Sequence, residues 1–194
     1  MAARPTRPAL RERYDRRREE VIQQAARTFA RRGYDQTAMQ ELAASMGLAT
    51  GALYHYFGGK EQLLRAICDQ LMEPLLERAA ELVSDGRPAE RQLRDLVRLW
   101  VDHVVEHRDH MLVFQQERHL IESGERWRAV RGARKSFELL VAELLARANP
   151  RGDERLALLA LLGMVNHTAQ WYRPRGPLAP RQIADGYLAL VLGG

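Results

Sequence analysis

The sequence predicts an all-α fold, on two observations. Apolar residues recur every three or four positions, and the alternating Val, Ile and Thr pattern of strands is almost absent. Hydrophobic residues make up 46% of the chain and aromatic residues only 7%. Ala, Leu and Arg, which favour helices, dominate instead. We therefore expect about nine helices around an apolar core.

The excess positive charge lies in the first third of the chain. Residues 1–60 contain 11 Lys or Arg and 6 Asp or Glu, whereas residues 61–194 contain 19 of each. A basic module on a neutral body is typical of a protein that binds a polyanion. A solvated basic tail is the simpler alternative. The single cysteine, Cys68, excludes an internal disulfide and favours a reducing cytoplasm. The sequence contains no stretch of about 18 apolar residues, so no transmembrane helix is expected.

The first predicted elements are a basic arm and one long helix. Residues 1–14 contain two prolines among arginines, and we expect a disordered arm there. A helix over about 15–32 follows, because its apolar residues form one stripe. They are Val21, Ile22, Ala25, Ala26, Phe29 and Ala30. Gly33 is expected to end this helix, and Tyr34 to fold back on Phe29.

Two short helices are predicted next. Thr37 and Gln40 have the spacing of a capping box, so a helix is expected over about 38–46. Gly47 ends it, and a helix of about seven residues begins near Thr50. Leu53 and Phe57, four residues apart, are expected to face inward.

The rest of the chain predicts six further helices. The first begins at Lys60, and Pro74 is expected to kink or end it. The others are expected at about 88–107, 110–122, 125–148, 154–172 and 180–192. Asp109 and Asp153 are suitable N-caps for two of them. Pro88 and Pro180 suit first-turn positions of two more.

The pair of short helices has the pattern of a helix-turn-helix, whose second helix can enter the DNA major groove. Gly51 would let that backbone approach DNA, since glycine has no side chain. Tyr54 and His55 can donate to phosphate oxygens. Lys60 and Thr37 stand at helix starts, where free amides favour phosphate. A small three-helix core with surface aromatics remains the alternative interpretation.

At these residues the chain resembles the TetR family of bacterial transcription regulators. The segment AARTFARRGYDQTAMQELAASMGLATGALYHYFGGKEQLL carries the resemblance, which covers about residues 16–72. It implies phosphate contacts from Thr37, Tyr54, His55 and Lys60. It implies proximity to base edges for Gln40, Thr50, Gly51 and Ala52. We expect a DNA-binding domain over 15–60 and a ligand-binding and dimerisation domain over 61–194.

Three residues depart from the family pattern. Ala49 stands where Ser or Thr is usual, so the second short helix lacks a side-chain N-cap, at a cost of about 1 kcal/mol. Ala52 replaces a common hydroxyl residue and can contact a thymine methyl instead. Gly59 replaces the usual polar cap of the next helix. These changes affect which DNA sequence is bound rather than DNA binding itself.

The family resemblance implies a homodimer on a palindromic operator, formed by the last two long helices. Residues 154–172 are apolar on most sides, which predicts a second buried surface beside the core. Gly163 would allow a close approach there. A central core helix of a monomer is the alternative for the same pattern.

The C-terminal segment HTAQWYRPRGPLAPRQIADGYLALVLGG resembles TetR regulators that respond to acyl-coenzyme A (acyl-CoA) thioesters. The resemblance implies a largely apolar effector cavity. Its candidate apolar lining is Trp100, Val104, Met111, Phe114, Phe137, Met164 and Trp171. Its candidate polar anchors are Asn166, His167 and Gln170. For each of these residues taken singly, ordinary core packing is the more common role.

The function predicted from the sequence is therefore a ligand-responsive DNA-binding regulator of the bacterial cytoplasm, a repressor released by a small apolar or acyl-CoA effector. A nonspecific DNA-binding protein is an alternative. A helical metal site is another, since His103, His107 and His110 are spaced for one helix face. No nucleophile motif or phosphate-binding glycine loop is present, so neither enzyme activity nor a cofactor is predicted. Whether the arginine arm (Arg4, Arg7, Arg11 and Arg13) contacts DNA stays open.

Overall fold

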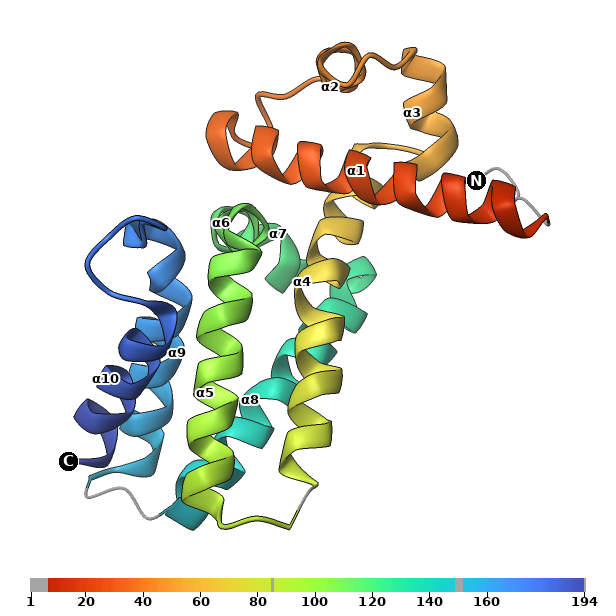
Figure 1. The fold of residues 1–194 in the computed structure, drawn as a ribbon. Coiled ribbons are helices and arrows are strands. Elements are labelled where there is room, and N and C mark those ends of the chain that lie inside the picture. The colour runs from red at the N-terminus through yellow and green to blue at the C-terminus, as the bar shows by residue number, and fades with distance from the viewer. Residues whose placement is uncertain (1–6, 85, 149–151, 194) are drawn as a thin grey trace.

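The computed structural model describes residues 7–84, 86–148 and 152–193. These residues form ten α-helices and one short 3-10 helix. The elements are α1 (Pro8–Arg32), α2 (Met39–Ser45), α3 (Thr50–Phe57), α4 (Lys60–Val83), α5 (Ala89–Glu106), α6 (Arg108–Gln116), α7 (Arg118–Ser123), η1 (Glu125–Trp127), α8 (Arg128–Ala148), α9 (Glu154–Trp171) and α10 (Pro180–Leu192). Figure 1 shows α1–α3 as a head above a helical body in which α4 and α5 run upright and α8 crosses obliquely, with α4 joining head and body. Within these ranges, no helix has both the length and the apolar character that a membrane span requires.

The first helix is longer than the sequence predicted. It begins at Pro8 rather than near residue 15, so residues 8–14 of the expected disordered arm are helical. Residues 1–6 of that arm, Arg4 included, lie outside the described residues. The predicted apolar stripe is correct, since five of its six residues are buried and Ala30 is partly buried. Tyr34 folds back on Phe29 as predicted, with ring centroids 5.3 Å apart.

The predicted capping box at Thr37 is wrong. Thr37 is 1% exposed, and its hydroxyl donates to the Gly33 carbonyl oxygen at 2.8 Å. That hydroxyl therefore faces back toward the end of α1 and is not available to the amides of α2. Ala38 is the N-cap of α2, with no side-chain hydrogen bond.

The third helix is close to its prediction. It begins at Thr50 after Ala49, which provides no side-chain cap, and its inward residues Leu53 and Phe57 are buried. Gly58 ends it in the left-handed conformation (φ 71°), which glycine adopts without a Cβ penalty. The Arg18 guanidinium of α1 lies 5.0 Å from the centre of the Phe57 ring. The core therefore fixes α3 by one side and leaves the other side outward.

The fourth helix connects the head to the body without a break. Pro74 does not end it, because the buried Leu71 and Leu75 on either side pack into the core and the helix continues to Val83. It packs against α5 and α8 in the body and against α1 in the head. α4 therefore contacts elements of both the head and the body.

Several helix boundaries in the body differ from their predictions. The expected helix over 110–122 is two helices, α6 and α7, and the segment before α8 is the 3-10 helix η1. His107 is the N-cap of α6, so Asp109 lies inside the first turn instead. Pro88 is itself the N-cap of α5. Asp153 caps α9 as predicted, with its carboxylate accepting from the Leu156 amide at 2.9 Å. Pro180 occupies the first turn of α10, also as predicted.

Candidate DNA-binding surface and effector region

The first turns of α3 present a continuous outer face. Gly51, Tyr54 and His55 are exposed, and Thr50 and Ala52 are partly exposed. Tyr54 is 44% exposed although it is a large aromatic residue. This exposure agrees with the sequence-based division of α3 into an inner apolar side and an outer polar side. A protein or nucleic-acid surface can therefore approach α3 along its length.

Internal packing does not require the glycine at position 51. A Cβ built there would meet no other atom within 4 Å. The absence of a side chain therefore leaves the backbone of α3 open to a molecule outside the protein. Close approach of a DNA edge is the use that the helix-turn-helix pattern suggests.

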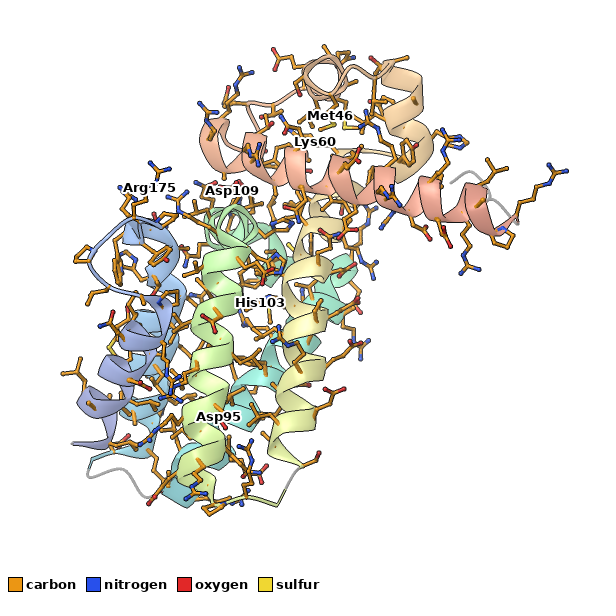
Figure 2. The ribbon with its side chains drawn as sticks, in the orientation of Figure 1. Met46, Lys60, Asp95, His103, Asp109 and Arg175 are labelled. Carbon is orange, nitrogen blue, oxygen red and sulfur yellow. The ribbon has the colours of Figure 1, made fainter. Side chains whose placement is uncertain are left out.

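Lys60 is held at the boundary between head and body. Its ammonium nitrogen lies 4.2 Å from the centre of the Tyr34 ring and donates to the Asp35 carbonyl oxygen at 3.3 Å. Figure 2 shows Lys60 beside α1, where the chain enters α4. The adjacent Glu61 is paired with Arg126 of η1 at 2.7 Å. This ion pair offsets a negative charge that would otherwise oppose a phosphate near Lys60.

The structure places the two candidate residues of the α2 region differently. Gln40 is exposed on α2. Thr37 is buried, and its hydroxyl is already hydrogen-bonded within the protein. The structure therefore brings Gln40 to the surface and keeps the Thr37 side chain inside.

Two contacts that hold α2 and α3 against α1 were not predicted from the sequence. The rings of Tyr14 and Tyr56 join α1 to α3 with centroids 4.9 Å apart. The Arg17 guanidinium donates to the Met46 carbonyl oxygen at 3.0 Å, at the end of α2. Tyr14 and Arg18 continue the spacing of the apolar stripe of α1 toward the N-terminus, and this signal could have extended the predicted helix.

The candidate effector residues divide into two groups. Five lie in the core, namely Trp100, Val104, Met111, Phe114 and Phe137. Trp100 of α5 and Phe137 of α8 meet edge to face, with centroids 4.9 Å apart. The other five lie nearer the surface of α9, where Met164 and Asn166 are partly buried and His167, Gln170 and Trp171 are exposed.

Hydrogen bonds tie the surface group to α6. The Gln170 side-chain amide donates to Gln115 Oε1 at 2.8 Å, and Gln115 Nε2 donates to the Asn166 carbonyl oxygen at 2.9 Å. Trp171 also borders a cavity of about 200 Å³ at the α9–α10 connection. The cavity is lined by Trp171, Tyr172, Arg173, Gly176, Pro177 and Leu178.

The three spaced histidines do not form a metal site. Their rings are near one another, with centroids 4.3 Å apart for His103 and His107 and 5.5 Å for His107 and His110. His103 Nε2, however, donates to the Leu71 carbonyl oxygen at 2.7 Å, and His110 Nε2 lies 3.2 Å from Gln70 Oε1. Among the residues that the structure describes, no metal-binding group of three or more side chains is found. The metal-binding interpretation is therefore not supported.

These histidines instead pack between α4 and the α5–α6 junction. Figure 2 shows His103 on the side of α5 that faces α4. Burial, followed by repulsion from His107, lowers the pKa of both His103 and His110 to about 4. Burial also lowers the pKa of His107. At neutral pH the cluster is therefore uncharged and behaves as part of the core.

Apolar side chains remain exposed on the last two long helices. On α9, Leu161 and Val165 are buried, while Leu156 and Leu159 are 65% and 54% exposed. Gly163 is also exposed, and Leu190 on α10 is 75% exposed. α9 therefore has the two apolar sides that its sequence predicted.

An outward short helix in a basic head, carried by a continuous helix into an all-helical body, defines a helix-turn-helix transcription regulator. Residues 21–67 match the family model described as bacterial regulatory proteins of the tetR family. Residues 85–194 match the model described as the tetracyclin repressor-like C-terminal domain. The chain belongs to the TetR family.

Named relatives are similar over almost the whole chain. The HTH-type transcriptional repressor KstR2 of Mycobacterium tuberculosis (strain ATCC 25618 / H37Rv) is 29% identical over 185 residues, covering 92% of each chain. The solved structure of the ketosteroid transcriptional regulator KstR2 of that species has a TM-score of 0.84 at 27% identity, over 92% of this chain and 94% of that one. AibR, solved in complex with isovaleryl coenzyme A and operator DNA, has a TM-score of 0.77 at 29% identity, over 91% and 98% of the two chains.

Proposed function

We propose that this regulator is a repressor of the bacterial cytoplasm that binds a palindromic operator as a homodimer and leaves it when an acyl-CoA thioester binds. The observation that carries the proposal is the path of α4. This helix starts with the partly exposed Lys60 at the boundary between head and body and continues unbroken to Val83 in the body. One element therefore belongs both to the DNA-binding surface and to the region that would sense an effector.

The proposed DNA contacts follow from exposure on the head. Tyr54, His55 and Lys60 contact phosphates and fix the register, whereas Thr50, Gly51 and Ala52 approach base edges. Gln40 on α2 is a further candidate for base proximity. The Thr37 hydroxyl is already bonded to the Gly33 carbonyl, so Thr37 supports DNA binding by holding the turn between α1 and α2 rather than by a side-chain contact to phosphate.

The proposed dimer uses the exposed apolar faces of α9 and α10. Leu156 and Leu159 of α9 and Leu190 of α10 would be covered by the same surface of a second chain. Two copies can place their α3 helices one DNA turn apart, about 34 Å, which is the spacing of two half-sites in a palindrome.

The proposed effector acts by stabilising one of two arrangements of α4. AibR, which is similar in structure, was solved with a coenzyme A thioester and operator DNA. In this chain the core between α4, α5 and α8 holds Trp100 against Phe137. An acyl group entering there would separate these helices and tilt α4. The ligand can shift the equilibrium only by its difference in affinity for the two arrangements.

Selection of bound sequences from random duplex DNA tests the DNA-binding part of the proposal. A palindromic consensus is expected, with a preference over unrelated duplex of about 10³-fold or more. Thr50→Ala or Ala52→Ser should change the selected consensus, since these residues face the base edges. A steep salt dependence without any consensus would instead indicate nonspecific DNA binding.

Titration of the selected DNA complex with acyl-CoA thioesters tests the effector. The series runs from isovaleryl-CoA to long-chain and polycyclic acyl-CoAs, with free coenzyme A and the free acids as controls. Release of DNA by one group of chain lengths, and not by the controls, is expected. Unchanged DNA affinity across the whole series would contradict the acyl-CoA proposal and leave the DNA-binding proposal standing.

A further inference from the structure

We propose that the N-terminal turns of α1 form a second DNA contact, in which Arg7 and Arg11 bind phosphates beside the part of the groove that α3 occupies. The inference rests on the proposed DNA-binding role of α3 and extends the contact surface to another helix. Figure 1 shows these turns of α1 continuing past α3 and α4, away from the body. They are therefore not needed to close the core of the head.

The orientation of this extension is set by contacts with α3. Tyr14 packs on Tyr56, and Arg18 lies over Phe57. Residues three or four apart share a helix face, so Arg11 lies one turn beyond Tyr14 on the side of α1 that faces α3. Arg7, immediately before the helix, continues the same face. Arg7 and Arg11 are both exposed, so this end of the face is open to solvent.

The charges along this part of α1 favour one helix face. Arg7, Arg11 and Arg18 share a face, whereas Glu12 and Glu19 lie toward the far side. Asp15 borders the basic face, but it already takes part in an interaction within the protein. Arg18 also lies near Asp69 of α4, whose carboxylate partly offsets its charge. The uncompensated positive charge of this face therefore lies at its N-terminal end, with Arg7 and Arg11, as a surface that approaches phosphates requires.

The two arginines at the end of this face are free to bind an anion. Arg7 and Arg11 are exposed, and within the described part of the chain neither side chain makes an ion pair or a hydrogen bond. Arg17, by contrast, is bound to Glu20 and to the Met46 carbonyl. Two unpaired guanidinium groups beside a DNA-reading helix fit phosphate oxygens.

The N-terminal extension of α1 is long enough for Arg7 and Arg11 to contact different phosphates. The seven residue steps from Arg7 to Tyr14 span about 10 Å of helix axis at 1.5 Å per step. That length corresponds to about three base-pair steps at 3.4 Å each. The two arginines would therefore contact phosphates next to those contacted through Tyr54 and Lys60.

The test compares Arg7→Ala/Arg11→Ala with Arg16→Ala, using full-length protein and the duplex selected by the wild-type chain. Arg16 is a matched control, because it is an exposed arginine on the opposite side of the same helix segment. The slope of log affinity against log salt should become shallower by about 0.9 for each phosphate that the variant no longer neutralises. At 0.1 M salt the same relation predicts about tenfold weaker binding per phosphate. The Arg16 variant should match the wild-type slope.

Phosphate ethylation interference gives an independent readout. The double variant should show one or two fewer interfering phosphates per half-site, while the selected base consensus stays unchanged. Equal slopes and equal interference patterns for the double variant and Arg16→Ala, with the wild type still bound to its operator, would overturn this inference alone. A wild-type protein that ignores duplex DNA at low salt would overturn the proposed function as well. An unchanged thermal unfolding midpoint confirms that the double variant folds.

Discussion

The ammonium group of Lys60 lies over the ring of Tyr34, 4.2 Å from its centre, and bonds to the carbonyl of the adjacent Asp35. This relationship joins the first residue of α4 to the loop between α1 and α2. A cation held over an aromatic face loses less freedom when it binds an anion, because its position is already restricted. The pair therefore places a positive charge at the boundary between the reading head and the helix that leads to the effector region.

Lys60→Ala is expected to weaken binding to every DNA sequence by a similar factor. The removed ammonium is a proposed phosphate contact, so the salt slope should decrease by about 1 for each protomer, with the consensus unchanged. Fluorescence anisotropy on the selected duplex and on a scrambled one measures both effects. Loss of binding to the selected duplex alone would show that Lys60 acts in sequence choice instead.

Ala49→Ser is expected to stabilise the protein. Ala49 has the extended conformation of an N-cap residue (φ −67°, ψ 142°) but offers no side-chain acceptor to α3. A serine hydroxyl there can accept from a free amide of the first turn, which contributes about 1 kcal/mol. Urea unfolding measures the gain. Ala44→Ser, a change at an exposed position inside α2, is the control and should not stabilise the protein.

Stability is expected to fall as pH falls from about 6.5 toward 4. His103 and His110 have pKa values of about 4 in the folded protein, mainly because of burial, whereas an unfolded histidine titrates near 6.5. Between these values the unfolded chain binds more protons, so acid favours unfolding. Each ring contributes up to roughly 3 kcal/mol to this loss. Glu106 acts in the opposite direction on His103, whose protonated form it favours, and Arg78 acts in the same direction as burial.

Unfolding in urea at a series of pH values measures this dependence. His110→Gln removes one of the buried rings and should give a flatter profile. His119→Gln, which changes an exposed histidine on α7, should keep the wild-type profile. A wild-type free energy of unfolding that stays constant between pH 6.5 and 4.5 would contradict the assignment of these rings as buried and neutral.

Leu159→Glu is expected to separate the proposed dimer. Leu159 is 54% exposed on α9, so a charged residue there is tolerated in the single chain but not inside an apolar interface. Sedimentation analysis should show monomers, and operator affinity should fall because one head reads only one half-site. Leu139→Glu, at a 56% exposed position on α8, is the matched control and should stay dimeric. If Leu159→Glu and Leu139→Glu had the same molecular mass in solution, the proposed α9–α10 interface would be contradicted.

Much of the fold and of the candidate site was predictable from local patterns. The apolar stripe of α1 and the inward pair Leu53 and Phe57 depend on helix periodicity alone. All of these residues are buried as predicted except Ala30, which is partly buried. Asp153 caps α9 because the N-cap preference is local. The exposed face of α3 follows from the same periodicity, since residues outside the apolar stripe must face outward.

The sequence by itself determined the helical class, the position of the helix-turn-helix head and the family resemblance, because each depends on residues that are close together along the chain. Only the tertiary structure decided where the Thr37 hydroxyl bonds, that Pro74 leaves α4 continuous, and that the candidate effector residues divide between core and surface. It also decided that the three histidines pack against α4 rather than gather around a metal. These outcomes depend on contacts between segments that are distant in the sequence, and helical periodicity does not specify such contacts.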